Sequence, residues 1–242
     1  MAANDVIDRL SRIQTCWTRL LTGAVGAEKD LLLRYYGAAF RYLVAMVRDA
    51  AVAEELAQEF AVRFMAGQYR QVHRERGRFR DFLKGCLRNL AHDHWRKQQK
   101  NQERLAGDAD VEPAVPPEPE ESDSFEAAWR EEVLARTWQA LANFEAESGK
   151  PYCTVLRLKT EAPVLRSEEL ADRLGHALNK RLSAEAVRQT LHRARETFAD
   201  LLLDEVGRTV TSDDRDRLEE ELIAVQMIDY CRKALERRYP RA

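Results

Sequence analysis

Four polar side chains in the last third of the chain are spaced so that they share one face of a helix. They are Arg188, Gln189, His192 and Arg193. The apolar residues of the same segment, 182–198, recur at helical spacing and are predicted to pack inward. These are Val187, Leu191, Ala194 and Phe198. Arginine can pair bidentately with guanine, and glutamine with adenine, each pair discriminating by about 1 to 3 kcal/mol. Arg188 and Gln189 are therefore candidates for reading DNA bases.

A second predicted helix, 167–175, precedes this segment and would position it. Ser183 is the expected N-cap of the later helix and Ser167 that of the earlier one, where acidic residues follow in the positive first turn. Two such helices are typical of a helix-turn-helix, whose second helix enters the major groove. The stretch between Gly175 and Val187 is longer than a tight turn, so either the first helix continues or the turn is enlarged. A helical hairpin with a solvated, arginine-rich face is the alternative interpretation.

Another group of candidate binding residues lies in a strongly basic stretch. From Arg63 to Arg104 there are twelve Lys or Arg against four Asp or Glu. The predicted loop 67–78 places Tyr69 and His73 among arginines, and a helix with further cations follows. Proteins that hold unpaired bases combine aromatic faces with cations, so this stretch is predicted to bind single-stranded nucleic acid. The candidates are Tyr69, His73, Arg78, Arg80, Lys84, Arg88, Trp95, Arg96 and Lys97, with packing an equal alternative for Trp95.

Charges of opposite sign are segregated along the chain. The 242 residues carry a formal net charge of −2, but 106–132 holds ten acidic residues and a single basic one, Arg130. Four of the seven prolines also fall between 106 and 124. Such a composition cannot bury enough apolar surface to order itself. We therefore predict a flexible acidic linker and a domain boundary there.

The rest of the sequence predicts helices. Apolar residues recur at helical spacing in three segments before the linker, with almost no alternation of the kind typical of strands. The three stripes are Leu32, Tyr36, Leu43 and Val47; Ala53, Leu56, Ala57, Phe60 and Phe64; and Phe79, Leu83, Cys86, Leu87 and Leu90. Near the end of the chain, 212–239 predicts one amphipathic helix with Leu218, Leu222 and Val225 on its apolar side. The expected fold is all-α.

Composition argues against several classes of protein. No apolar run approaches the roughly 20 residues that span a bilayer, and the first residues lack the plan of a signal peptide, so we expect a cytoplasmic protein without a membrane partner. The four cysteines form no CxxC pair, which favours buried thiols over a zinc site or disulfides.

Motifs for catalysis are also missing from the sequence. Paired carboxylates, nucleophile elbows and glycine-rich phosphate loops do not occur. We therefore expect no enzyme activity, no metal and no cofactor. The pair His92 and Asp93, with His73 upstream, leaves a metal-dependent phosphohydrolase as a weak alternative.

Three stretches of the chain carry a family resemblance. They are RDAAVAEELAQEF (48–60), GRFRDFLKGCLRNLAHDHWRK (77–97) and AVRQTLHRARE (186–196). The first two resemble region 2, and the third region 4, of a bacterial RNA polymerase sigma factor of the extracytoplasmic-function (ECF) type. The resemblance covers roughly 31–100 and 126–205. It implies an all-α protein with a region 2-like domain at 1–105, the acidic linker at 106–124, a region 4-like helix-turn-helix domain at 125–206 and a helical extension of unassigned role at 207–242.

The resemblance also implies partners and site residues. An acidic helix would bind the clamp of core RNA polymerase through Asp49, Glu54, Glu55, Gln58 and Glu59. The alternative is that these residues form a solvated acidic face without a partner. Asn89 joins the basic-stretch candidates, which would contact the minus-ten element of promoter DNA and assist its melting. Arg188 and its neighbours would contact the minus-thirty-five element. An anti-sigma factor is left open as a further partner. The alternative function is a helix-turn-helix regulator that does not bind core polymerase, which would leave the first domain unexplained.

Overall fold

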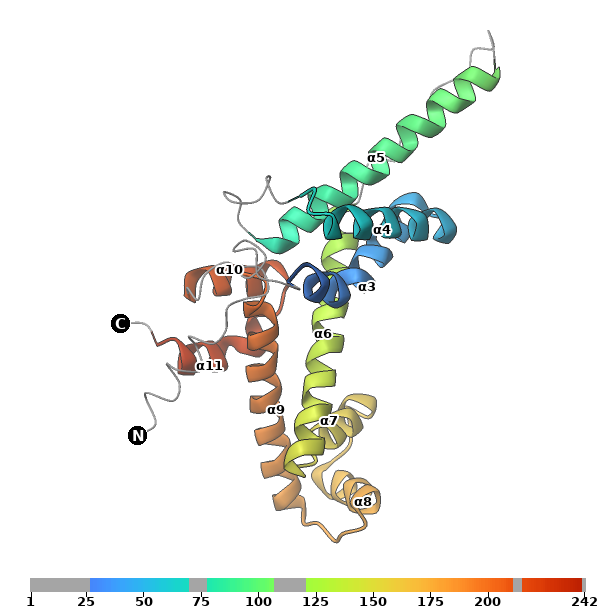
Figure 1. The fold of residues 1–242 in the computed structure, drawn as a ribbon. Coiled ribbons are helices and arrows are strands. Elements are labelled where there is room, and N and C mark those ends of the chain that lie inside the picture. The colour runs from blue at the N-terminus through green and yellow to red at the C-terminus, as the bar shows by residue number, and fades with distance from the viewer. Residues whose placement is uncertain (1–26, 70–77, 107–120, 211–214, 241–242) are drawn as a thin grey trace. The chain divides into compact units, whose positions relative to one another are not determined.

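A computed structural model describes residues 27–69, 78–106, 121–210 and 215–240, and every regular element in these ranges is an α-helix (Figure 1). The expected all-α fold is thereby confirmed. The helices are α3 (Ala27–Val47), α4 (Ala50–Met65), α5 (Phe79–Ala106), α6 (Glu121–Ser148), α7 (Tyr152–Glu161), α8 (Ser167–Leu178), α9 (Ala184–Gly207), α10 (Arg215–Ala224) and α11 (Ile228–Arg238). Among the described residues, no helix has the length and apolar character that a membrane crossing requires.

The described helices form two compact units, each built from two separate parts of the chain. The first unit comprises Met1–Glu132 and Gly207–Val225, and the second comprises Val133–Val206 and Gln226–Ala242. This division differs from the predicted domains 1–105 and 125–206, because the start of α6 and all of α10 group with the first unit. Of the predicted linker 106–124, the last four residues already belong to α6, and 107–120 lie outside the described residues.

The first unit is organised around a hairpin of α3 and α4. Arg48 ends α3 in the left-handed region, with φ of 56°, and the next residue, Asp49, caps α4. All five apolar residues predicted for the α4 stripe are buried, as are four of the five predicted for α5, the exception being the half-buried Cys86. The spacing of apolar residues alone thus identified the inner faces of both helices.

In α3 the buried stripe differs from the predicted one. Leu43 is buried, but Leu32, Tyr36 and Val47 are only partly so, and the fully buried residues are Leu31, Tyr35, Ala38, Ala39, Tyr42 and Met46. The reason is a second partner that the local pattern does not contain. Trp129 of α6 stacks on Tyr35 with ring centroids 4.5 Å apart, and Phe125 meets Tyr42 edge-on at 4.9 Å. The sequence pattern indicated the helix correctly but not which of its sides is innermost.

In the second unit, α8 and α9 are the two helices of the segment predicted to form a helix-turn-helix. The core of this unit joins residues of α6, α7, α8 and α9, among them Leu141, Val155, Leu174, Val187 and Ala194. Ser183 caps α9 as predicted, its Oγ accepting a hydrogen bond from the amide of Ala186 at 3.1 Å. The prediction that Ser167 caps α8 is wrong. Ser167 is the first helical residue, and the Glu169 carboxylate instead accepts a hydrogen bond from the backbone amide of Arg166.

The C-terminal extension forms two helices rather than the single one predicted. α10 ends at Ala224 and α11 begins at Ile228, with Gln226 between them in the left-handed region at φ of 58°. Leu218, Leu222 and Val225 are buried as predicted, in the first unit, whereas Cys231 of α11 is buried in the second. The break lets one amphipathic segment supply apolar side chains to two separate cores.

Buried thiols were expected, and two of the three described cysteines, Cys153 and Cys231, are buried. Burial raises the pKa of the Cys86 and Cys231 thiols from 9.0 to about 12, and the nearby Asp200 contributes to the rise at Cys231. These groups are therefore protonated at neutral pH. Cys16 lies outside the described residues.

Candidate nucleic-acid interface

The acidic residues of α4 divide between a structural role and an exposed face. Asp49 uses its carboxylate to cap the helix, accepting from the amides of Ala51 at 2.8 Å and Val52 at 3.2 Å. Glu54, Glu55 and Gln58 are exposed on α4, away from its buried stripe, whereas the half-buried Glu59 pairs with Arg63. The face that a cationic partner could contact thus consists of three of the five predicted residues.

At the start of α5 the predicted DNA-binding cations are engaged in internal ion pairs. Arg80 is only 4% exposed; its Nε donates to Glu221 Oε1 at 2.8 Å and its Nη1 donates to Glu126. Burial tends to lower the pKa of this guanidinium, but the carboxylates of Glu221 and Glu126 raise it above the ordinary arginine value. Arg80 was predicted to contact DNA. In the structure its donors are buried and directed at carboxylates within the first unit, which does not favour that role.

Two neighbouring cations are paired but less deeply buried. Arg78 approaches Glu220 at 3.2 Å and Glu221 at 3.3 Å, and Lys84 approaches Glu126 at 3.4 Å. The carboxylates come from α6 and α10, which follow the basic stretch far along the sequence. Sequence reasoning missed all three glutamates, and no local signal identifies them, because only the tertiary fold brings them to α5.

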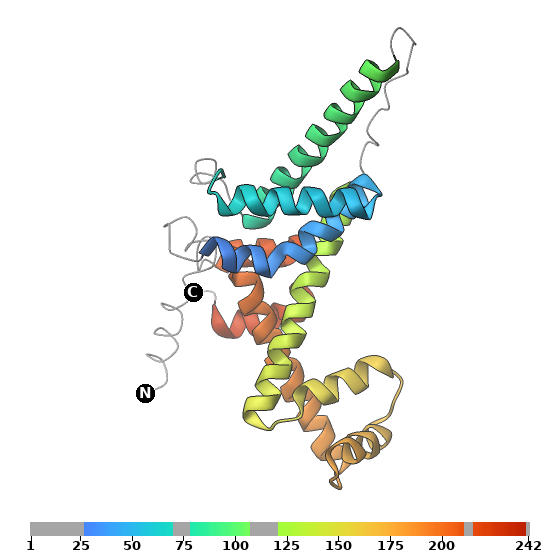
Figure 2. The same cartoon turned by 45° about the vertical axis from the view of Figure 1, so that its right-hand side comes forward.

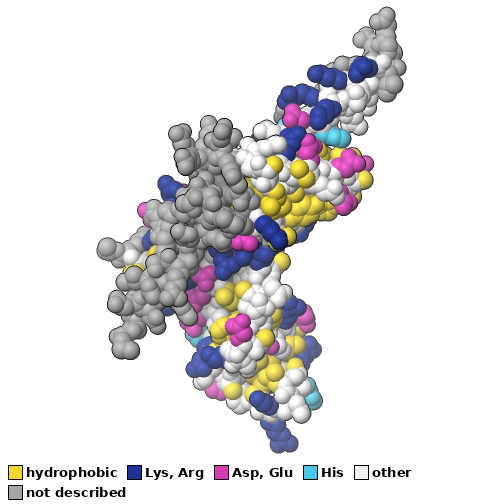
Figure 3. All heavy atoms as spheres, in the orientation of Figure 1, with side chains coloured by type: hydrophobic (Ala, Val, Ile, Leu, Met, Phe, Trp, Pro, Cys, Tyr) yellow, Lys and Arg dark blue, Asp and Glu magenta, His cyan; other side chains and the backbone are white. Residues whose placement is uncertain are grey.

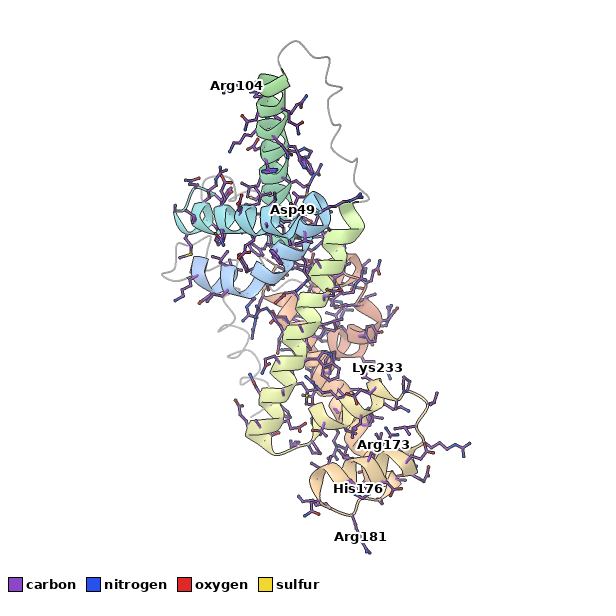
Figure 4. All side chains as sticks on the ribbon, turned by 90° about the vertical axis from the view of Figure 1, so that its right-hand side faces the viewer. Asp49, Arg104, Arg173, His176, Arg181 and Lys233 are labelled. Carbon is purple, nitrogen blue, oxygen red and sulfur yellow. The ribbon has the colours of Figure 1, made fainter. Side chains whose placement is uncertain are left out.

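Farther along, α5 presents an exposed cationic side. In Figures 1 and 2 this part of the helix extends beyond α3 and α4, and Figure 3 shows dark blue Lys and Arg side chains along it. Arg88, Asn89, Arg96 and Lys97 are exposed, and Trp95 is partly so. Arg88, Trp95 and Arg96 stand at i, i+7 and i+8, which places them on the same side of a helix. Arg104, labelled in Figure 4 at the far end of α5, continues the run of exposed cations.

Trp95 contacts another ring on the same side of α5. His92 meets it edge-on, with centroids 5.3 Å apart. The indole remains only partly buried, so a partner could still contact it.

Tyr69 lies against an aromatic cluster rather than standing free. Its ring is 5.8 Å from Phe60, 6.0 Å from Phe82 and 6.5 Å from Phe64. Burial raises the pKa of its hydroxyl, with a smaller contribution from Cys86. The predicted role in capping an unstacked base would require one face of this ring, which is half-buried. His73, the other residue predicted for that role, lies outside the described residues.

The predicted base-reading face of α9 is exposed. Arg188, Gln189, His192 and Arg193 are all accessible, while Val187 and Ala194 on the opposite side are buried. Glu185, one turn earlier, accepts from Gln189 Nε2 at 3.3 Å and from the Arg188 guanidinium. These hydrogen bonds, first from Arg188 and then from Gln189, lower the pKa of the Glu185 carboxyl.

The turn before α9 resolves the alternatives left by the sequence. α8 continues to Leu178, so the first helix is longer than predicted, and Asn179 ends it in the left-handed region with φ of 52°. The Lys180 amide donates to the Gly175 carbonyl at 2.9 Å, which folds the chain back sharply. Arg181 in this turn points away from the helices of its unit, and His176 and Arg173 lie on α8 (Figure 4).

Within the described part of the chain, no group of three or more His, Cys, Asp or Glu residues is placed to hold a metal ion. The described residues thus offer two cationic surfaces, one on α5 in the first unit and one on α9 in the second, and an acidic face on α4.

Comparison with known proteins identifies part of the first unit. Residues 31–101, from α3 through most of α5, match the family model described as Sigma-70 region 2. The match supports a sigma factor, a class of protein that takes part in promoter recognition and transcription initiation and is not a family of enzymes. No curated protein and no solved structure matched the chain.

Proposed function

We propose that the chain is an alternative sigma factor of the ECF type, which binds core RNA polymerase and directs promoter recognition, DNA melting and transcription initiation. The observation that carries the proposal is the agreement between the region 2 match and the surfaces of α4 and α5. Both helices lie within residues 31–101 for most of their length, and their exposed faces carry opposite charges. An acidic face suits a protein partner, whereas a cationic face with an accessible tryptophan suits single-stranded DNA.

In this proposal the first unit binds two partners through two helices. Glu54, Glu55 and Gln58 on α4 contact the polymerase. Arg88, Asn89, Arg96 and Lys97 contact phosphates or bases of the minus-ten element, and Trp95 stacks at the edge of the melted segment. The remaining initiation chemistry belongs to the polymerase, so no catalytic residue is proposed.

The second unit supplies the upstream contact through α9. The pairing of Arg188 with Glu185 is of the i,i+3 kind and exposed to solvent, so it is weak and easily exchanged. A bidentate contact of an arginine with guanine is worth about 1 to 3 kcal/mol, so the DNA base can displace the carboxylate. Arg188 and Gln189 are the proposed base readers, with His192 and Arg193 contacting phosphates nearby.

Transcription reconstituted from the purified chain and bacterial core RNA polymerase tests this function. We expect the chain to comigrate with core polymerase and to permit initiation at promoters selected from a random library. Arg188→Ala and Gln189→Ala should relax selection at one or two upstream positions, whereas Arg96→Ala should weaken opening at most promoters. Arg232→Ala, which removes an exposed arginine of α11, serves as the control.

The alternative, a helix-turn-helix regulator that does not bind polymerase, predicts a different outcome. Such a protein binds duplex DNA unaided and does not comigrate with core polymerase. If the chain neither binds core polymerase nor enables initiation, the sigma-factor function is wrong. An anti-sigma partner is proposed only as a candidate, to be sought by copurification once activity is established.

A further inference from the structure

The cations at the start of α5 and the carboxylates that face them form two layers. In the inner layer Arg80 binds Glu221, and both side chains are almost fully buried, at 5% and 0% exposed. In the outer layer Arg78 is 31% exposed and Glu220 is 62% exposed, with 3.2 Å between Arg78 Nη2 and Glu220 Oε2. Lys84 and Glu126 lie between these extremes, at 19% each. Solvent therefore reaches the outer pair while the inner pair is held within the core.

The two layers differ in how easily their ion pairs separate. Breaking the inner pair would leave the buried Glu221 with only Arg78, at 3.3 Å, as a partner, which is strongly unfavourable. An outer pair with a mostly exposed carboxylate is held weakly and is screened by salt. Another anion can replace Glu220 at Arg78 without undocking α10, whose apolar residues Leu218 and Leu222 remain buried.

A carboxylate and a phosphate satisfy arginine in the same way, through charge-assisted hydrogen bonds from the guanidinium. Glu220 therefore occupies a position that a nucleic-acid phosphate could take. Arg78 directly precedes α5, whose exposed side is the proposed site for the minus-ten element. The competing anion is therefore a strand of DNA rather than a small anion.

We propose that Glu220 of α10 acts as a built-in competitor for single-stranded DNA at Arg78, so that the strand reaches the start of α5 only by exchanging phosphate for this carboxylate. The inference rests on the proposed role of α5 in binding nucleic acid. It also assigns a role to the C-terminal extension, because α10 anchors itself through Glu221 and limits DNA binding through Glu220. Arg78 then contributes to DNA binding only when the polymerase or an adjacent contact holds the strand close to it.

The test compares variants of the full-length chain for binding to a short, mixed-sequence single-stranded DNA labelled with fluorescein. Glu220→Gln removes the competing charge and keeps the side-chain shape. We expect its affinity to rise by about one and a half to fivefold at low salt, the range that an exposed ion pair can contribute. The slope of log affinity against log salt should also steepen by about 0.7, as one additional phosphate contact requires.

Glu131→Gln provides the matched control. Glu131 is 69% exposed and lies 3.4 Å from Arg41 in the same unit, so its replacement changes the net charge equally without touching Arg78. This variant should leave the affinity and the salt slope close to wild type. A second comparison uses the Arg78→Gln background, in which Glu220→Gln should no longer raise the affinity.

Three outcomes would overturn the inference. They are equal affinities for wild type and Glu220→Gln, an equal gain from Glu131→Gln, and a gain that persists in the Arg78→Gln background. Circular dichroism spectra of each variant confirm that binding is compared between folded proteins. Because no polymerase is present, the result is separate from the transcription assay: an unchanged affinity refutes the competitor even if initiation succeeds, and a gain supports it even if initiation fails.

Discussion

Residues of the same type have different roles on α5 because their surroundings differ. Arg80 and Arg96 both lie on this helix and both were predicted to contact DNA. The Arg96 side chain is 74% exposed and has a weak partner in Asp93 at 3.8 Å, whereas Arg80 is buried against Glu221 and Glu126. A buried charge must be matched by a partner, while an exposed one can exchange its partner for another. Only the exposed arginine suits a reversible contact.

Replacement of Arg80 by Met should destabilise the first unit strongly. We expect the free energy of unfolding to fall by up to about 3 to 5 kcal/mol, because the buried Glu221 would lose its closer cation, Arg80, and keep only Arg78 at 3.3 Å. Arg96→Met should change it by no more than about 0.5 kcal/mol. Urea unfolding followed by circular dichroism measures both. The double variant Arg80→Met, Glu221→Met should recover much of the loss. Equal losses of stability in Arg80→Met and Arg96→Met would contradict the assigned ion pair.

At the scale of elements, the helix-turn-helix depends on a close approach between α8 and the turn that follows it. A Cβ atom on Gly175 would lie 2.6 Å from the Lys180 carbonyl oxygen, which is backbone and cannot rotate away. The absence of a side chain at this position therefore allows the chain to fold back and start α9 where it does. The orientation of the proposed base-reading face of α9 depends on this turn.

Two glycine-to-alanine replacements should have opposite effects. Gly175→Ala should destabilise the second unit by about 1 to 3 kcal/mol, because the turn must shift to accept the methyl group. Gly85→Ala in α5, where a Cβ meets nothing within 4 Å, should stabilise by about 0.5 to 1 kcal/mol through better helix propensity. Thermal unfolding of the two variants checks the signs. Stabilisation by Gly175→Ala would show that the turn is not tightly packed.

At the scale of the whole molecule, neither unit is a continuous piece of sequence. Residues 207–225 return to the first unit and 226–242 to the second, so the C-terminal extension is part of both cores. Leu218, Leu222 and Val225 are at most 3% exposed in the first unit, and burial of each such side chain contributes about 1.5 to 3 kcal/mol. The region 2-like segment is therefore completed by residues that follow the helix-turn-helix.

Two truncations should separate the contributions of α10 and α11. A chain ending at Val225 loses α11, and we expect faster amide exchange at the end of α9 with α3 to α5 still protected. A chain ending at Val206 also loses α10, and protection of α3 to α5 should fall as well. Hydrogen exchange measured by mass spectrometry resolves the two units. Equal protection of α3 to α5 in both truncations would show that α10 is dispensable for the first unit.

Local sequence was sufficient for the helical fold, the inner face of α4, the Ser183 cap and the polar face of α9. Each of these follows from side chains within a few turns of one another, and the helical period assigns them to a side without knowledge of the rest of the chain. The region 2-like helices were identified differently, by the resemblance of the motifs at 48–60 and 77–97 to sigma factor region 2.

Tertiary contacts alone settled the innermost side of α3, the break between α10 and α11, and the burial of Arg80. Glu221, the partner of Arg80, lies 141 residues later in the sequence. Trp129, which stacks on Tyr35 of α3, follows the acidic linker. A run of basic residues has the same local pattern whether its charges face solvent or carboxylates. Which cations remain accessible to DNA depends on packing between distant segments, and that packing leaves the later part of α5 exposed and encloses its start.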